Sequence, residues 1–325
     1  MRWFTRKRPE APENGGGVRK LPPNALPRGF LLYDQYRVES LMGSGGFSFV
    51  YLAYRIATQS KVVVKEYYPH ALVQRIPGGR VLPLGEDLLP RYQIGLARFF
   101  QEGLALSKVQ HRHVVRVSNF FKFNGTAYLV MDFEEGRDLR WFIKRHPGKL
   151  DQDFIAHVFP PVLRGLAAIH DQGYLHLDIK PANIMINDFG RAVLLDFGAV
   201  QPMGEGKRFE GVQTLTHGFA APEQYKQGPM GPWADIYAIG ATIAASIIGE
   251  SPPPATEREK KDALPCFARS YGRRFDRRFL ESLDRAIALD WNRRPRDVHE
   301  MLRACGFGEA DTAEAPSDWI SAWLK

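Results

Sequence analysis

The stretch HLDIKPAN, from His176 to Asn183, constrains this chain more than any other part of its sequence. Thirteen residues after Asn183 the triplet Asp196-Phe197-Gly198 begins. Together the two motifs provide a carboxylate beside a lysine, then an amide and a second carboxylate. These groups can hold a hydroxyl, a triphosphate and Mg²⁺ in one line, so the pattern indicates phosphoryl transfer.

A glycine-rich segment lies upstream, between two runs of alternating apolar residues, Tyr36 to Leu41 and Phe49 to Tyr54. This pattern predicts a β-hairpin. Glycine lets the backbone of such a turn approach phosphates, with free N–H groups facing the anion. A glycine turn also has an ordinary structural explanation, so the segment is weak evidence on its own. Its positions are Gly43, Ser44, Gly45, Gly46, Phe47 and, in the second strand, Val50.

The next feature is the β-branched run from Val62 to Val64, which predicts a buried strand that ends in Lys65. A lysine at a strand end is often only a solvated side chain. Because this lysine follows a glycine-rich hairpin and precedes the two motifs above, a functional role is the stronger interpretation.

These motifs, in this order, resemble those of the eukaryotic-type protein kinase family, with bacterial serine/threonine kinases as the nearest group. The resemblance extends from about Tyr36 to about Cys305. It implies an α+β fold with two lobes. The N-lobe is small, antiparallel and β-rich, with one helix, and the C-lobe is larger and mainly α-helical.

The resemblance implies a role for each charged residue of the motifs. Lys65 corresponds to the lysine that holds the α- and β-phosphates of ATP, and Glu102 to its ion-pair partner on the N-lobe helix. Asp178 corresponds to the residue that accepts or orients the proton of the substrate hydroxyl. Lys180 corresponds to a lysine that steadies the γ-phosphate and is typical of serine/threonine rather than tyrosine kinases.

Asn183 and Asp196 correspond to the ligands of Mg²⁺, with Mn²⁺ as an alternative. Oxygen ligands suit a hard cation that keeps several waters and relies on phosphate oxygens. Met131 corresponds to the gatekeeper of the adenine pocket, and the hinge after it offers backbone groups to adenine. The ATP-binding positions outside the glycine-rich segment are Val63, Lys65, Met131, Asp132, Glu134 and Met185.

Residues 196–223 resemble an activation segment that holds two threonines and no serine. Thr216 lies where the family has a threonine whose hydroxyl contacts the aspartate and lysine of the HLDIKPAN motif, so a structural role is expected. Thr214 is the candidate for autophosphorylation. At the end of the segment Glu223 is expected to form an ion pair with Arg294.

The nearly uncharged run from Ile236 to Gly249 predicts the buried central helix of the C-lobe. Asp235 stands at its start, where it can accept backbone N–H groups. The resemblance makes this aspartate the residue that braces the 176–183 loop.

Three positions depart from the family pattern. Leu177 replaces an arginine that usually clamps a phosphorylated activation segment through charge-assisted hydrogen bonds, so phosphorylation of Thr214 is not expected to be an on-switch. Ser48 replaces a glycine, and Val63 replaces a small alanine and narrows the adenine pocket. No charge or metal ligand is lost, so an active enzyme is expected.

Two alternatives stay open. A nucleotide-binding scaffold with little turnover is suggested by Leu177 and Val63. A small-molecule kinase shares the two-lobed plan. However, Glu223 and Arg294 belong to a platform for protein substrates that a small acceptor does not need.

Composition suggests how the chain is organised. The first residues are rich in proline, glycine and basic side chains, which favours disorder. Between Lys65 and Glu102 the chain is long enough for an inserted hairpin with a glycine turn. Near the C-terminus Trp319, Ile320 and Trp323 recur at helical spacing. The expected parts are a disordered arm (1–28), a kinase domain (29–305) with N-lobe (29–132), inserted hairpin (about 70–90) and C-lobe (133–305), and an amphipathic tail that packs on the C-lobe (306–325).

Charge and cysteine content limit the function further. The net charge of +8 comes from the first twenty residues and from Arg273 to Arg296, without the aromatic interleaving of a nucleic-acid site, so no nucleic-acid partner is expected. No transmembrane span or secretory signal is expected, and two cysteines make a disulfide framework implausible. A cytoplasmic protein is therefore expected. The resemblance implies protein substrates with Ser or Thr, and a metal-dependent protein phosphatase as a partner.

Overall fold

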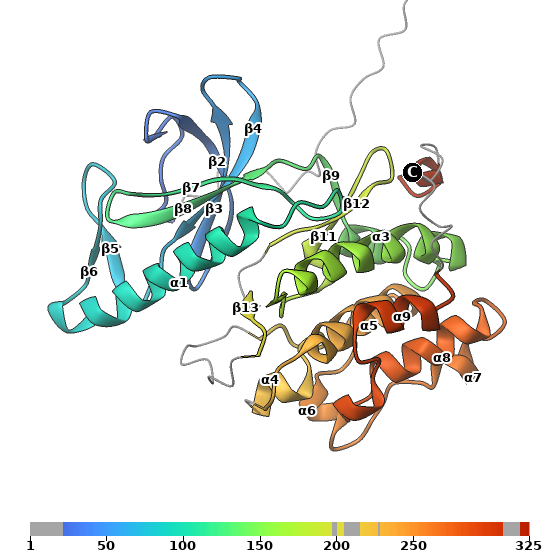
Figure 1. The fold of residues 1–325 in the computed structure, drawn as a ribbon. Coiled ribbons are helices and arrows are strands. Elements are labelled where there is room, and N and C mark those ends of the chain that lie inside the picture. The colour runs from blue at the N-terminus through green and yellow to red at the C-terminus, as the bar shows by residue number, and fades with distance from the viewer. Residues whose placement is uncertain (1–21, 197–199, 205–214, 227, 308–318, 325) are drawn as a thin grey trace, which may run out of the picture.

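The computed structural model describes residues 22–324 apart from 197–199, 205–214, 227 and 308–318. A β-rich lobe from the first part of the chain lies against a larger helical lobe from the rest (Figure 1). Buried apolar side chains form two clusters, one mainly in each lobe. The two-lobed α+β architecture predicted from the sequence is confirmed.

The N-lobe is an antiparallel sheet with one long helix. It contains β1 (Leu31–Leu32), β2 (Tyr36–Gly45), β3 (Ser48–Arg55), β4 (Lys61–Tyr67), β7 (Val117–Phe123), β8 (Thr126–Asp132) and α1 (Leu89–Ser107). The strand order is β1-β2-β3-β4-β8-β7. Alternate side chains of β3 are buried, as expected for a strand whose side chains point to opposite faces. Helix α1 lies across β7 and β8.

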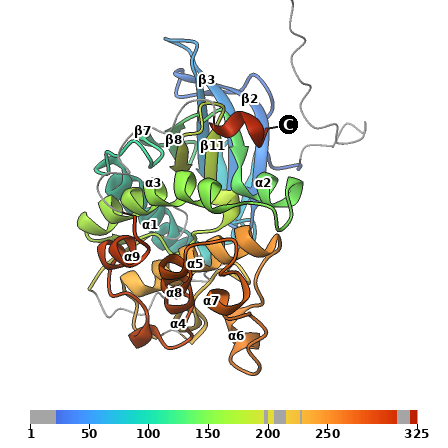
Figure 2. The same cartoon turned by 90° about the vertical axis from the view of Figure 1, so that its right-hand side faces the viewer.

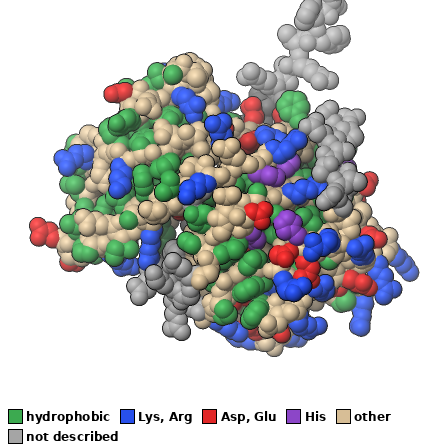
Figure 3. Space-filling model, viewed as in Figure 1, with side chains coloured by type: hydrophobic (Ala, Val, Ile, Leu, Met, Phe, Trp, Pro, Cys, Tyr) green, Lys and Arg blue, Asp and Glu red, His purple; other side chains and the backbone are tan. Residues whose placement is uncertain are grey.

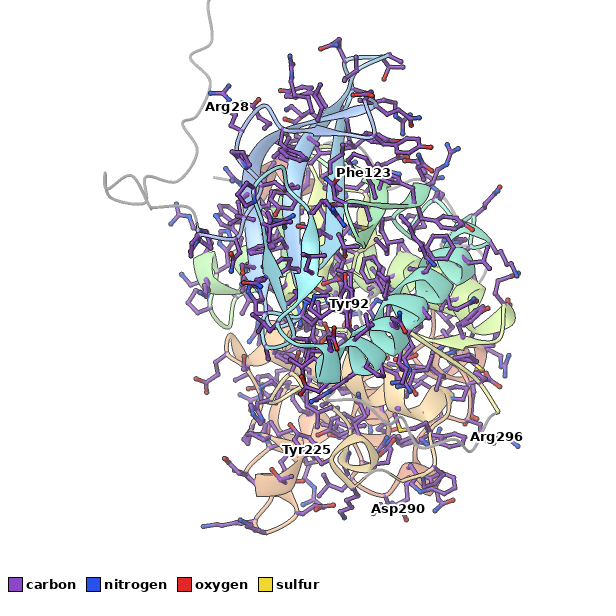
Figure 4. All side chains as sticks on the ribbon, turned by 90° about the vertical axis from the view of Figure 1, so that its left-hand side faces the viewer. Arg28, Tyr92, Phe123, Tyr225, Asp290 and Arg296 are labelled. Carbon is purple, nitrogen blue, oxygen red and sulfur yellow. The ribbon has the colours of Figure 1, made fainter. Side chains whose placement is uncertain are left out.

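The insertion between β4 and α1 contains the expected hairpin. Strand β5 (Val73–Arg75) pairs antiparallel with β6 (Val81–Pro83), and the 3₁₀ turn η1 (Glu86–Leu88) leads into α1. Gly78 and Gly79 turn the hairpin with φ of 86° and 87°, a left-handed conformation that favours glycine. Tyr92 of α1 donates to the backbone oxygen of Gly125 in the β7–β8 turn at 2.7 Å, so the helix is fixed to this side of the lobe (Figure 4).

A buried ion pair attaches the hairpin to the sheet. Arg75 Nη2 lies 2.6 Å from Glu66 Oε2, and the Glu66 side chain is 0% exposed. The hydroxyls of Tyr51 and Tyr128 donate to the same carboxylate at 3.1 and 2.7 Å. Because side chains alternate along a strand, Glu66 points to the face of the sheet opposite to that of Lys65. Arg75 of the hairpin therefore contacts the face of the sheet opposite to that of Lys65.

Part of the predicted disordered arm is instead packed on the N-lobe. Leu26 is 1% exposed, and its N–H donates to the hydroxyl of Tyr51 at 3.1 Å. Arg75 Nε donates to the backbone oxygen of Asn24 at 2.7 Å. The predicted boundary at residue 28 is therefore wrong. The prediction used the average composition of residues 1–28, which are rich in proline and basic side chains. An average of this kind does not reveal that one residue, Leu26, is buried.

The C-lobe is a group of helices with small sheets at the junction with the N-lobe. Its helices are α2 (Leu139–Arg145), α3 (Gln152–Asp171), α4 (Pro222–Lys226), α5 (Pro232–Ile248), α6 (Ala255–Arg258), α7 (Phe267–Ser270), α8 (Arg277–Ala286) and α9 (Val298–Ala304), with 3₁₀ turns η2 (Pro181–Asn183), η3 (Trp291–Arg293) and η5 (Trp319–Ala322). Its strands are β9 (Gly136–Asp138), β10 (Tyr174–Leu175), β11 (Ile184–Asn187), β12 (Ala192–Leu194) and β13 (Gln201–Pro202).

Helix α5 is the buried centre of this lobe, with α3, α8 and α9 packed around it (Figure 2). It begins at Pro232, four residues before the predicted run, because proline fits the first helical position. In the part of the chain that the structure describes, no helix is long and apolar enough to cross a membrane.

The C-terminal aromatic residues pack on the C-lobe through the turn η5 rather than through an α-helix. The Trp319 ring stacks on His157 at a centroid distance of 4.7 Å, and Ile320 is 0% exposed. Trp323 packs edge-on against Phe154 at 5.2 Å. The chain end therefore lies beside α2 and α3 (Figure 2).

Many of the C-lobe basic side chains have acidic partners. Arg277 pairs with Glu281 at 2.8 Å, and Arg285 and Arg296 pair with Glu300 at 2.8 and 3.4 Å. Figure 3 shows acidic side chains among the basic ones on the lower part of the molecule.

Candidate functional site

The loop between β10 and β11 places Lys180 and Asn183 beside Asp178, and Thr216 joins them from a later part of the chain. Lys180 Nζ donates to both carboxylate oxygens of Asp178, at 2.9 and 2.7 Å. Asn183 Nδ2 donates to Asp178 Oδ2 at 3.1 Å and to the Asp178 backbone oxygen at 2.8 Å. The Thr216 hydroxyl donates to Asp178 Oδ1 at 2.7 Å and accepts from Lys180 Nζ at 3.0 Å. These contacts hold the carboxylate in one orientation, and those of Thr216 are the ones expected from the sequence.

Asp235 holds the 176–183 loop in place through hydrogen bonds to its backbone. Its carboxylate accepts the N–H of His176 at 2.8 Å and the N–H of Leu177 at 2.7 Å. His170 Nε2 lies 2.8 Å from the same carboxylate. Asp235 therefore accepts backbone N–H groups as expected, but the two it receives belong to the 176–183 loop and not to its own helix, whose N-cap is Gly231.

Lys65 and Asp196 form an ion pair between the lobes, with Nζ 2.6 Å from Oδ1. Strand β4 positions Lys65, which is 7% exposed and lies opposite Val50 of β3. Burial alone would lower the pKa of Lys65, but the carboxylates of Asp196 and Glu102 raise it overall. The charged form of this lysine is therefore stabilised.

Glu102 does not form the predicted ion pair with Lys65. Its Oε1 is buried and accepts no hydrogen bond from the described residues. Burial raises the pKa of Glu102 to about 8, because the Lys65 ammonium offsets only part of the desolvation. Lys65 contacts the carboxylate of Asp196 instead. The sequence could not decide between these two partners, since the choice depends on how α1 is placed against β4.

Glu102→Gln is expected to change how stability depends on pH. Between the ordinary glutamate pKa of 4.5 and the folded value of about 8, the folded protein holds a proton that the unfolded chain has lost. The free energy of unfolding therefore falls as the pH rises through this window, by at most about 1.4 kcal/mol per pH unit. The variant lacks this contribution. The free energy of unfolding of the wild type minus that of the variant, measured in urea titrations, should therefore decrease from pH 5 to pH 8.

The exposed Glu135, substituted in the same way, is the control for the chemical change itself. A difference for Glu102→Gln that is constant or increases between pH 5 and pH 8 would contradict the raised pKa.

The glycine-rich turn has space around it. A Cβ added at Gly43, Gly45 or Gly46 would meet no atom within 4 Å, and none of these glycines has a positive φ. Neither packing nor backbone conformation therefore requires glycine at these positions. The turn is tied to the chain after β4, since the N–H of Tyr68 donates to the Phe47 oxygen at 2.8 Å and that of His70 to the Gly46 oxygen at 3.2 Å.

The hinge follows β8. Met131 is 8% exposed and pairs across the sheet with Val63. The Asp132 N–H donates to the Arg116 oxygen at 3.0 Å, so this group is already used within the protein.

Two other predicted pocket residues flank the hinge. The side chain of Glu134 is paired with Arg191 at 2.7 Å. Met185 is half-buried in β11, the central strand of the small sheet β12-β11-β9.

The predicted ion pair between Glu223 and Arg294 is present and buried. Arg294 Nη1 lies 2.7 Å from Glu223 Oε1, and Nη2 lies 3.2 Å from Oε2. Arg294 is 2% exposed and also donates to three backbone oxygens. Thr214, the predicted phosphorylation site, lies outside the described residues. The Leu177 side chain is 5% exposed and packs in the C-lobe core.

Residues 36–296 match the model of the protein kinase domain. The chain belongs to the protein kinase family. Its membership confirms the family predicted from the sequence, and the family generally uses ATP and a divalent metal ion.

Relatives and solved structures agree with this family. The chain is 30% identical to serine/threonine-protein kinase PknL of Mycobacterium tuberculosis over 223 residues, which are 68% of this chain and 51% of PknL. It is 28% identical to serine/threonine-protein kinase F of Synechocystis over 306 residues, 88% of this chain and 58% of the relative. The chain thus spans about half the length of these curated relatives. The structure called PpkA-294 apo form is similar with a TM-score of 0.75 and 33% identity, over 87% of this chain and 99% of that one.

Two residues that contact the site were not predicted from the sequence. His170 contacts Asp235, and Gln224 contacts the 176–183 loop. Neither belongs to a motif that the sequence made visible, although Gln224 directly follows Glu223.

Proposed function

We propose that this protein is an ATP-dependent serine/threonine protein kinase of bacterial signalling that transfers the γ-phosphate of Mg-ATP to hydroxyls of protein substrates and of itself. The observation that carries the proposal is the cluster of Lys180, Asn183 and Thr216 around the Asp178 carboxylate. Such a cluster can orient a hydroxyl and stabilise charge on a transferred phosphoryl group.

Each residue has a defined task in this proposal. Asp178 accepts or orients the proton of the attacking hydroxyl. Lys180, 2.7 Å from Asp178 Oδ2, provides positive charge beside the attacking oxygen. Lys65 holds the α- and β-phosphates, and Glu102 pairs with it when α1 moves toward β4. Through its hydrogen bonds to Asp178 and Lys180, Thr216 holds the segment that would bind a protein substrate beside Asp178.

The residues present fit ATP and a divalent cation. The space around Gly43, Gly45 and Gly46 allows phosphates to approach the turn. The Asn183 amide N–H₂ is occupied by Asp178, which leaves its carbonyl oxygen for a cation, together with Asp196. Mg²⁺ needs only one or two such ligands when phosphate oxygens supply the rest, and Mn²⁺ has similar preferences. Bound Mg²⁺ would neutralise charge on the β- and γ-phosphates.

The substrates, the location and a partner of the kinase are part of this proposal. Protein substrates follow from the platform formed by Glu223 and Arg294. A cytoplasmic location and a metal-dependent protein phosphatase as partner are what the resemblance to bacterial kinases implies. A nucleotide-binding scaffold is the second candidate, favoured by Leu177, which lacks the charge to clamp a phosphorylated segment.

Mass-spectrometric mapping of phosphate on the purified chain after incubation with Mg-ATP tests the proposal. We expect phosphoserine or phosphothreonine that is absent without the cation. Nucleotide binding with no phosphate on the chain or on a generic protein acceptor would favour the scaffold instead.

Thr214→Ala is expected to lower transfer to a protein acceptor by less than about tenfold. Charge-assisted hydrogen bonds from an arginine are what usually make such a phosphate an on-switch, and Leu177 provides none. Initial rates at saturating ATP would measure the effect. A loss as large as that of Asp178→Asn would show that Thr214 is essential.

A further inference from the structure

Gln224 joins the end of the activation segment to the 176–183 loop. Its side chain is 7% exposed. Its Nε2 donates to the backbone oxygen of Leu177 at 3.1 Å, and its Oε1 accepts the N–H of Ala221 at 2.9 Å. Both ends of one buried amide are therefore used, each by the backbone of a different segment.

The backbone of Leu177 needs such support. Its φ of 61° is left-handed, a conformation that costs free energy for a branched residue and persists only where neighbours enforce it. Asp235 accepts the Leu177 N–H at 2.7 Å, and Gln224 donates to the Leu177 oxygen. The N–H of Asp178 donates to His176 Nδ1 at 3.3 Å.

These contacts fix one particular peptide plane. The Leu177 oxygen and the Asp178 N–H belong to the same planar unit, because the peptide bond does not rotate. Gln224 holds one edge of this plane and His176 the other. The direction in which the Asp178 side chain leaves the backbone is set by this unit.

We propose that Gln224 is a positioning residue for phosphoryl transfer, acting through the Leu177–Asp178 peptide. The inference rests on the proposed kinase function and deepens it. Without the Gln224 amide the Leu177 oxygen has no other hydrogen-bond partner among the residues that the structure describes, and the peptide is free to tilt. The same amide connects this peptide to Ala221, so the segment that would carry a protein substrate is coupled to Asp178 as well.

The test is a single-turnover measurement on the full chain. Limiting labelled ATP is mixed with excess enzyme, Mg²⁺ and a saturating protein acceptor, for wild type and Gln224→Met. Methionine has nearly the same size and removes both hydrogen bonds. We expect the rate constant to fall at least about tenfold, since a misplacement of about 1 Å can cost on the order of 100-fold. The Kd for Mg-ATP is expected to stay within about twofold, because Lys65 and the glycine-rich turn belong to the N-lobe and Gln224 to the C-lobe.

The single-turnover rate constant reports folded sites only, which separates positioning from a loss of folded protein. If Gln224→Met binds no ATP, Gln224→Leu takes its place. The matched control is Tyr225→Phe, the next residue of α4 (Figure 4). Among the described residues its hydroxyl is hydrogen-bonded only to the exposed His217, at 3.2 Å, so its rate should match wild type. A Gln224 variant that transfers within twofold of wild type would overturn the inference and leave the kinase function intact. A wild type that binds ATP and transfers nothing would overturn both.

Discussion

Asp178→Asn is expected to lower kcat for transfer to a protein acceptor by about 10³-fold or more, because an amide cannot accept the hydroxyl proton. The substitution also removes the negative charge that Lys180 contacts at 2.7 and 2.9 Å, so both the proton acceptor and the lysine it orients are affected. Steady-state rates at saturating Mg-ATP, with calorimetric titration of nucleotide, would measure the loss. The Kd for Mg-ATP should change little, since Asp178 is not among the proposed phosphate or metal ligands.

The control for this substitution is Asp171→Asn, which makes the same chemical change on the exposed end of α3. It should retain wild-type activity. If Asp178→Asn kept more than a tenth of the wild-type kcat, Asp178 would not have the role assigned to it.

Arg75→Met is expected to lower the free energy of unfolding by about 3–5 kcal/mol, because it leaves the Glu66 carboxylate buried without its cation. Burial already raises the pKa of Glu66 despite Arg75. Loss of the cation raises it further, so the penalty is fully present at high pH and lessens at low pH, where Glu66 is protonated. Urea titrations at pH 8 and pH 5, with the m-value monitored, would measure both effects.

A second substitution separates the charge from the packing. Arg75→Met combined with Glu66→Gln should recover much of the loss, since glutamine keeps partners for Tyr51 and Tyr128 without a buried charge. Arg80→Met, on the exposed part of the same hairpin, should change stability by less than about 0.5 kcal/mol. An Arg75→Met variant as stable as wild type would mean that the hairpin does not depend on this ion pair.

The sequence predicted well what short segments encode. The glycine turn at Gly78 and Gly79 and the buried helix after Asp235 follow from local preferences, and the structure contains both. It predicted the Glu223–Arg294 pair only through the family resemblance, because nothing local connects two residues so far apart.

The sequence could not predict contacts that depend on how helices and strands are placed relative to one another. Whether Lys65 meets Glu102 or Asp196 depends on the position of α1 and on the backbone at Asp196, whose φ is 48°. Gln224 shows no periodicity or motif that would reveal its contact with Leu177. Leu26 lies in a proline-rich segment whose apolar residues follow neither the helical nor the strand period, so no pattern marks it as buried.

The inserted hairpin is closed at its base. The N–H of Leu84 donates to the backbone oxygen of Leu72 at 2.9 Å, so the chain leaves the insertion close to where it entered. A segment with adjacent ends can be gained or lost in one evolutionary step without redirecting the strand before it or the helix after it. The same closure makes this the place where a foreign domain could be grafted onto the N-lobe, provided that Arg75 remains to contact Glu66.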